Sequence, residues 1–196
     1  METVQLSGSS RANVGKKGTK AVRDAGNVPC ILYGSGEQLA FQVRKADIMK
    51  LIFNPNVYQI ELDIDGVKKK AILQDKQMHP VTDKPLHVDF LELADDKEVK
   101  MRIPLRISGR SKGVMNGGKL MTNFRSIKVA GLPKDLPAVI ELDVTPLRIN
   151  QAIRTSEISI PGVRVLADPN AVVVAVKMAR GAVLVDDEEE EEASAE

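Results

Sequence analysis

Four side chains in the first half of the chain could hold a metal or support covalent catalysis: Cys30, His79, His87 and Asp89. Two histidines eight residues apart, the first followed by proline, do not have the compact spacing of a zinc site. Nucleophilic catalysis would need an activated thiol, a histidine base and a third group that orients the base. The apolar run VPCILYG instead predicts a buried strand with Cys30 in the core. We therefore expect neither a metal site nor an enzyme.

Glycine-rich segments offer a second kind of chemistry, the binding of a nucleotide phosphate. In GKKGT, a phosphate-binding loop of the form GxxxxGK[ST] would require glycine at Ser10 and serine or threonine at Lys17, and both conditions fail. The GSG at 34–36 lacks the later glycine of a dinucleotide-binding fingerprint and is expected to be a turn. No nucleotide, cofactor or small-molecule substrate is expected.

The strongest chemical signal is a cluster of cations near the start of the chain. Residues 11–23, RANVGKKGTKAVR, hold five cations and no acid. Cations on short glycine-spaced segments suit nucleic-acid phosphates, which supply affinity without reading sequence. If residues 18–25 form a helix, Lys20 and Arg23 share one face. The alternative interpretation is a solvated basic surface that binds nothing.

Charge is sorted along the chain, although the formal net charge is only +1. Residues 1–93 carry +2, residues 94–185 carry +7 and residues 186–196 carry −8. Seven successive acids repel one another and cannot bury apolar surface, so the tail at 186–196 is expected to be disordered. The tail is either a solubilising segment or a mimic of nucleic acid that competes for the basic surface.

The elements that position these groups are predicted to be mainly strands. Alternation of apolar and polar residues predicts strands at 41–43, 58–64, 67–75, 86–93, 99–107, 126–131, 138–144 and 171–177. A hairpin turn is expected at Asp65-Gly66. Pro104 cannot donate to a β-ladder and is expected at an edge or a bulge.

Two helices and one domain boundary complete the expected organisation. Helical spacing predicts one helix over 47–52 and another over 146–153, the second capped by Thr145. The acidic segment at 94–98 is the predicted boundary between a domain at 1–93 and a domain at 94–185. A single cysteine and the lack of a long apolar run predict a soluble, cytoplasmic protein without a membrane segment.

A family resemblance rests on three ordered motifs and a matching second half. The motifs are R-x3-GKKGTKAVRDAGNVPCILYG, ILQDKQMHP and LHVDFLEL, followed by MRIPLRISGRSKGVMNGGKL and SEISIPGVRVLADPNAVVVAV. Together they resemble the bacterial ribosomal proteins that bind 5S ribosomal RNA (rRNA), the family of the twenty-fifth protein of the large subunit. The similarity is to the long form, known as the Ctc or general stress protein branch.

This resemblance implies a mainly β fold, with an N-terminal six-stranded β-barrel carrying short helices, a second mainly β domain and an acidic tail. It implies docking on the loop-E region of 5S rRNA within the large ribosomal subunit, with neighbouring ribosomal proteins as further partners. The family's RNA contacts correspond to Arg11, Lys16, Lys17, Thr19, Lys20, Arg23, Tyr33, Gln74, Gln77, His79, His87 and Asp89. Lysine and arginine would hold phosphates, whereas Tyr, Gln, His and Asp would reach base edges or 2′-hydroxyls.

The chain departs from the family pattern at two places. Family members commonly pair two arginines where this chain has Lys20-Ala21, so position 20 would bind phosphate as a point charge. The segment at 149–153, INQAI, replaces a glycine–acid pair and is expected to be a local change within a helix.

The second domain gives less specific signals. Its glycine-rich loop SGRSKGVMNGGKL carries Arg110, Lys112 and Lys119, which either bind rRNA or lie on a solvated hairpin tip. Two further functions stay open from the sequence. One is a stress-linked protein of this fold that binds assembling or stalled subunits conditionally, and the other is a β-rich protein-interaction module.

Overall fold

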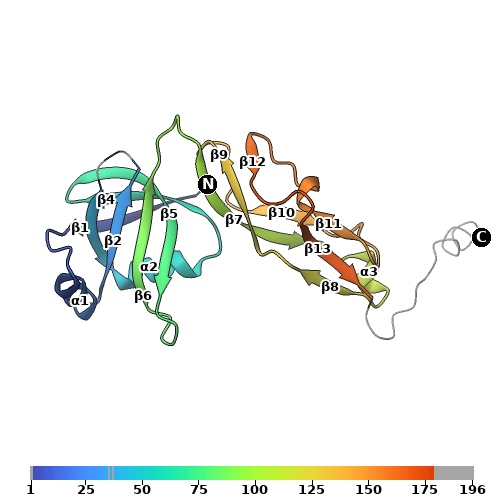
Figure 1. The fold of residues 1–196 in the computed structure, drawn as a ribbon, viewed down its shortest axis with the longest axis horizontal. Coiled ribbons are helices and arrows are strands. Elements are labelled where there is room, and N and C mark those ends of the chain that lie inside the picture. Colours follow the sequence, from blue (N-terminus) through green and yellow to red (C-terminus); the bar gives the residue numbers. More distant parts are fainter. Residues whose placement is uncertain (1, 35, 37, 179–196) are drawn as a thin grey trace, which may run out of the picture.

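The computed structural model describes residues 2–34, 36 and 38–178 (Figure 1). These residues form a closed six-stranded β-barrel followed by a second, mainly β domain, and helices are few and short. The predicted fold class is therefore confirmed. The acidic tail at 186–196, predicted to be disordered, lies outside the described residues.

The barrel consists of six strands with two helices inserted between them. Its strands close in the order β1-β3-β2-β6-β5-β4, and the pairs β1–β4 and β2–β6 are parallel. The bounds are β1 Glu2–Ser10, α1 Lys16–Asp24, β2 Asn27–Tyr33, β3 Leu39–Arg44, α2 Lys45–Phe53, β4 Tyr58–Ile64, β5 Val67–Met78 and β6 Pro85–Glu92.

Apolar residues at alternate positions of these strands fill the barrel interior. Phe41 and Phe90 are fully buried, and their ring centroids lie 5.6 Å apart in a tilted arrangement. Cys30 is also fully buried, as predicted, and its thiol donates to the Val28 carbonyl at 3.5 Å. Burial raises the pKa of the Cys30 thiol well above its usual range, so the thiol stays protonated. Such a cysteine is a core residue and not a nucleophile.

The long strand β5 follows a tight turn, and its pairing with β6 shifts register between Leu73 and Asp75 and again between Gln77 and Met78. At its start, Asp65 and Gly66 both have positive φ, 51° and 90°, which is the geometry of the predicted tight hairpin turn. Further along, Leu73 pairs with Phe90 while Asp75 pairs with Asp89, so Gln74 is the extra residue of a bulge. A bulge bends its strand and redirects side chains, and Gln74 at this one lines a groove together with residues of the second domain.

The second domain packs two sheets against each other. One sheet has the order β10-β7-β9-β12 and the other has the order β11-β13-β8. Val129, Val173 and Val176 are among the fully buried residues between them. The bounds are β7 Val99–Ser108, α3 Lys112–Met115, β8 Lys119–Thr122, β9 Ser126–Gly131, β10 Ile140–Asp143, β11 Ala152–Arg154, the 3-10 turn η1 Thr155–Glu157, β12 Val163–Val165 and β13 Val172–Lys177.

The predicted helix over 146–153 is wrong. Residues 146–151 alternate between turns and irregular backbone, and the strand β11 begins at Ala152. The Leu147 carbonyl accepts from Gly113 N, and Asn150 N donates to Val176, so these backbone groups are used between elements and not within a helix. Asn150 also has a φ of 65°, which no helix interior tolerates. The INQAI segment is therefore a turn entering a strand.

Pro104 lies where β7 changes its pairing. It forms the last register pair with β9, opposite Ser126, and the pairing with β10 begins at Leu105. The proline therefore has no ladder partner on the β10 side, where its missing N–H costs nothing.

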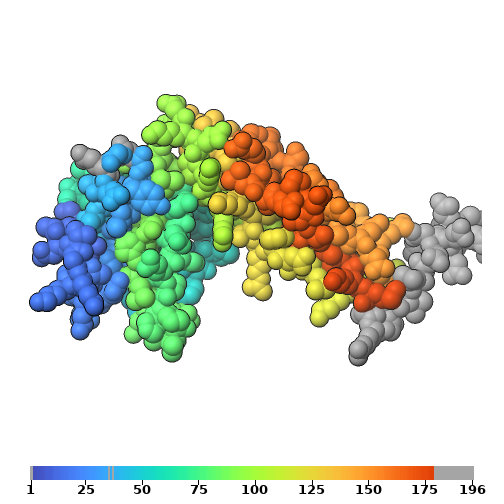
Figure 2. Space-filling view, in the orientation of Figure 1, coloured from blue at the N-terminus to red at the C-terminus, as the bar shows by residue number. Residues whose placement is uncertain are grey.

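Barrel and second domain are in contact, and the molecule is elongated (Figure 2). The barrel residue Ile72 belongs to the buried cluster of the second domain, and Val57 N donates to the Ala138 carbonyl at 3.3 Å. β6 ends at Glu92 and β7 begins at Val99, with the acidic segment at 94–98 between them. We retain this segment as the proposed domain boundary.

Candidate nucleic-acid interface

A shallow hollow on the outer surface of the barrel gathers five of the predicted RNA contacts. Its volume is about 320 Å³, and Gln38 and Ile31 complete its lining. The strands β2, β5 and β6 lie side by side here, and Gln77 stands directly opposite His87 in the ladder. The five predicted contacts that the hollow brings together are Arg23, Tyr33, Gln77, His87 and Asp89.

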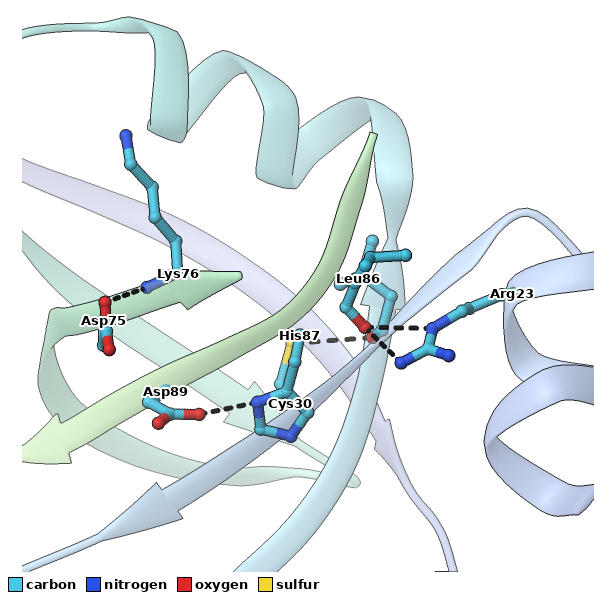
Figure 3. A network of polar contacts seen from close by, with 8 residues as sticks. Arg23, Cys30, Asp75, Lys76, Leu86, His87 and Asp89 are labelled. Carbon is cyan, nitrogen blue, oxygen red and sulfur yellow. Dashed lines mark hydrogen bonds and ion pairs between the residues drawn. The ribbon is translucent and has the colours of Figure 1, made fainter. Parts of the chain in front are cut away.

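His87 and Asp89 form the polar centre of this hollow (Figure 3). They are two residues apart on β6 and therefore share its outer face. Val88, which lies between them, and Phe90, which follows, point into the barrel and are buried. His87 Nδ1 lies 2.6 Å from Asp89 Oδ1, and their side chains are 18% and 31% exposed. This contact fixes the imidazole ring and leaves Nε2 as the ring nitrogen that can bind a ligand.

Arg23 connects helix α1 to this strand. Its Nε and Nη2 both donate to the Leu86 carbonyl, at 3.0 and 2.9 Å (Figure 3). A guanidinium has five N–H donors in a planar fork, so donors remain for a phosphate or a base. The residue predicted to contact RNA is therefore also a structural link between α1 and β6.

Tyr33 ends strand β2 beside Asp89 and Asp75. Burial, and then the nearby carboxylates Asp89 and Asp75, raise the pKa of the Tyr33 hydroxyl. The phenol therefore remains a neutral hydrogen-bond donor over the physiological pH range, and its ring offers a flat face.

Three predicted phosphate-binding lysines, Lys16, Lys17 and Lys20, project from α1 and are exposed. The helix has no acid in its first turn and no side-chain cap at Gly15. The N-terminal end of a helix carries a partial positive charge, so Lys16 and Lys17 concentrate positive charge where the free backbone N–H groups already favour an anion.

Arg11 and Thr19 are committed to contacts within the protein. The Thr19 hydroxyl donates to the Gly15 carbonyl at 3.0 Å and accepts from Arg11 Nη1 at 3.4 Å. Both side chains thus support the first turn of α1. Neither side chain lines the hollow.

His79 lies in the connection between β5 and β6 and does not line the hollow. Its Nδ1 accepts from Val81 N at 3.2 Å and from Thr82 N at 3.3 Å, which caps the turn. Asp83 in this turn has a φ of 49°. His79 therefore has a structural task that the sequence did not reveal.

A larger groove of about 660 Å³ lies between the barrel and the second domain. The remaining barrel candidate, Gln74, lines it together with Tyr33 and Asp89, which also line the hollow. The opposite wall carries cations from β7 and β9, Lys100, Arg102 and Lys128. The excess of positive charge over residues 94–185 indicated a basic surface in the second domain. The sites predicted there, however, were only the cations of the glycine-rich loop that follows β7.

That loop, with Arg110, Lys112 and Lys119, lies at the end of the second domain that is far from the barrel (Figure 1). It is not a simple hairpin tip, because Ser111 caps α3 by accepting from Val114 N at 3.2 Å and Gly113 is buried. The three cations are exposed and are not brought together with the barrel hollow.

Other kinds of site find little support in the described part of the chain. Among residues 2–34, 36 and 38–178, no three His, Cys, Asp or Glu side chains are grouped as metal ligands. No helix within the same ranges is long and apolar enough to cross a bilayer.

Comparisons with known proteins find similarity over most of the chain. Residues 6–90 match the Ribosomal L25p family, and residues 98–180 match the family described as Ribosomal protein TL5, C-terminal domain. The large ribosomal subunit protein bL25 of Porphyromonas gingivalis is 40% identical over 184 residues, which is 93% of this chain and 96% of the relative. The bL25 protein of Christiangramia forsetii is 39% identical over 189 residues, covering 95% and 86%, and that of Cytophaga hutchinsonii is 41% identical over 158 residues, covering 81% and 82%.

A barrel with a basic helix beside a polar hollow, and relatives of this kind over nearly the whole length, define a structural ribosomal protein and not an enzyme. The chain belongs to the L25p family of the bacterial large ribosomal subunit.

Proposed function

We propose that the barrel binds the loop-E region of 5S rRNA and so anchors the chain in the large subunit of cytoplasmic ribosomes. The observation that carries this proposal is the juxtaposition of the basic helix α1 with the hollow formed by Arg23, Tyr33, Gln77, His87 and Asp89. An irregular RNA helix presents phosphates beside accessible base edges and 2′-hydroxyls, and this surface offers a group for each of them.

The hollow and the adjoining edge of the groove, where Asp89 lines both and Asp75 lines the groove, are chemically unlike a surface that binds phosphates alone. Asp75 and Asp89 stand directly opposite each other in the β5–β6 ladder, where like charges are unfavourable. The contact between His87 Nδ1 and Asp89 Oδ1, at 2.6 Å, lessens this repulsion by giving the Asp89 carboxylate a partner. Carboxylates repel phosphate but accept from the amino groups of adenine, cytosine or guanine, so they favour a site at which bases are contacted.

Helix α1 supplies the phosphate contacts in this proposal. Its exposed lysines and the positive end of the helix dipole act together at Gly15–Lys17. Arg23 joins the two regions, because its guanidinium is held against the Leu86 carbonyl at the edge of the hollow. The lysines would set affinity, and the hollow would set specificity.

A titration against paired RNAs tests this function. The full chain is titrated with 5S rRNA and with a variant in which loop E is replaced by Watson–Crick pairs. We expect binding to the variant to be at least tenfold weaker at about 0.15 M salt, since each lost base-specific contact costs about 1–3 kcal/mol. Equal affinity for both RNAs would contradict recognition of loop E.

A further inference from the structure

Cations occupy one face of the sheet formed by β7, β9 and β12. Along β7, Val99, Met101 and Ile103 are buried, while Lys100 and Arg102 between them are exposed. Arg102 stands directly opposite Lys128 of β9 in the ladder. In the next row, Ala130 separates Lys100 from Arg164 of β12. The alternation that buries one face thus places four cations on the other, Lys100, Arg102, Lys128 and Arg164, which we call the basic sheet face.

No ion pair among the residues that the structure describes neutralises this charge, since none of the four side chains takes part in one. Like charges directly opposite each other on a sheet are destabilising, so the Arg102–Lys128 pair is unfavourable in the free protein. An anion bound on this face between Arg102 and Lys128 would attract both side chains and so offset their repulsion.

Three of the four cations of the basic sheet face lie on one wall of the groove between the two domains. Lys100, Arg102 and Lys128 line this groove, and Tyr33 and Asp89 on the barrel wall line both the groove and the barrel hollow. The two recesses are therefore continuous across Tyr33 and Asp89. In the space-filling view, the outline of the molecule is recessed between the tip of the β5–β6 hairpin and the second domain (Figure 2).

From this continuity we propose that the basic sheet face binds phosphates of the same RNA that the barrel hollow binds. The RNA lies across Tyr33 and Asp89, so that its bases meet the barrel wall and its backbone meets Lys100, Arg102 and Lys128. The proposal rests on the proposed function and extends it, because it gives the second domain a direct share in 5S rRNA binding.

The charges on the barrel side of the groove favour RNA over an acidic protein as its partner. Asp75 and Asp89 line this groove opposite the cations of β7 and β9, and Lys76 of the barrel, which also lines it, donates its Nζ to the Ile52 carbonyl at 3.3 Å. A stretch of acidic polypeptide would be attracted by one wall and repelled by the other. A nucleic acid carries phosphates on one side and amino groups on its bases, so it complements both walls.

The test compares two triple variants of the full chain that remove equal charge. The first is Lys100→Ala/Arg102→Ala/Lys128→Ala, and the control is Lys97→Ala/Lys134→Ala/Lys177→Ala, which removes exposed cations outside the groove. The affinity of each for 5S rRNA is measured from 50 to 300 mM salt. Thermal unfolding confirms that both variants fold.

We expect the salt dependence of binding, the slope of log K against log salt, to fall by about two to three for the groove variant and by less than one for the control. At 100 mM salt the groove variant should bind about tenfold to a hundredfold more weakly than the wild type. Arg102→Glu alone should weaken binding more than Lys134→Glu, which provides a second test with a single exposed change.

Three outcomes are separable. If the wild type does not prefer 5S rRNA, the proposed function is wrong, and this inference, which rests on it, is wrong as well. If the wild type binds but both triple variants keep its slope, the basic sheet face does not contact the RNA, and the inference is wrong. If the groove variant keeps the RNA slope but loses affinity for polyglutamate, the face takes an acidic protein partner, which also overturns it.

Discussion

His87 Nδ1 lies 2.6 Å from Asp89 Oδ1 on the outer face of β6, and this pair joins the two recesses of the molecule. Of the two recesses, His87 lines only the barrel hollow, whereas Asp89 lines both the hollow and the interdomain groove. The pair therefore holds a fixed imidazole at the place where the proposed base contacts meet the proposed phosphate contacts.

Loss of either member of this pair should reduce specificity. His87→Ala and Asp89→Ala are each expected to cost about 1–3 kcal/mol of binding to 5S rRNA, and much less on an unrelated folded RNA. Because Asp89 orients His87, the double variant should lose less than the sum of the two single losses. Binding titrations of the three variants on both RNAs measure this, and equal weakening on the two RNAs would show that these residues do not read the RNA.

The lysines of α1 should contribute affinity that depends on salt. Replacing Lys16, Lys17 and Lys20 together with alanine is expected to lower the salt slope of 5S rRNA binding by about two to three. The free energy of unfolding should barely change, because these side chains are exposed and α1 buries no residue. An unchanged slope would remove the lysines from the interface.

We expect Arg23 to hold α1 against β6 as well as to contact RNA. Arg23→Lys keeps the charge but loses the two-donor contact with the Leu86 carbonyl. Amide hydrogen exchange over Lys16–Asp24 should become faster in this variant, while the exchange of Phe90 and the other core amides of the barrel stays slow. Unchanged exchange in α1 would mean that other contacts hold the helix.

Cys30 should be inert in the folded protein. Its buried thiol has a raised pKa, so native protein should react with iodoacetamide far more slowly than unfolded protein at pH 8. The folded state retains the proton above the ordinary thiol pKa of 9.0, and the unfolded state releases it. Stability should therefore decrease as the pH rises above about 9. Labelling of native protein at the rate of a free thiol would contradict this account.

Gly113 should be sensitive to a single added methyl group. A Cβ there would lie 2.6 Å from the Arg148 carbonyl carbon and 2.7 Å from Ile149 N, both backbone atoms that cannot move aside. We expect Gly113→Ala to cost about 1–3 kcal/mol of unfolding free energy. Gly15→Ala is the control, since no atom lies within 4 Å of its Cβ position, and it should cost under about 1 kcal/mol. Similar melting temperatures for the two variants would contradict this packing.

Periodicity predicted most of the strands because one face of each is buried. The strand β4, for example, alternates the buried Ile60, Leu62 and Ile64 with partly exposed polar residues. Strand β1 gave no such signal, since Leu6 is its one fully buried residue and the strand is held by pairing with β4 and β3. The turn at 146–151 was mistaken for a helix because its local propensity is overridden by backbone bonds to α3 and β13.

Residue types indicated candidate contacts but not their arrangement. The bulge at Gln74 depends on pairing with β6, and the bond from Arg23 to the Leu86 carbonyl joins segments that are distant in sequence. The turn capped by His79 is local, but histidine is not among the residue types that mark a turn. The basic sheet face was visible only as an excess of charge, because register between β7 and β9 decides that Arg102 meets Lys128. Such pairings can be read only from the three-dimensional structure.

The most direct test of the central claim is to map where the full chain protects 5S rRNA from hydroxyl radicals. The account predicts protection of riboses on both strands of loop E, and loss of that protection when His87 and Asp89 are both replaced with alanine. Protection elsewhere on 5S rRNA, or a loop-E footprint that the double variant leaves intact, would contradict recognition through this surface.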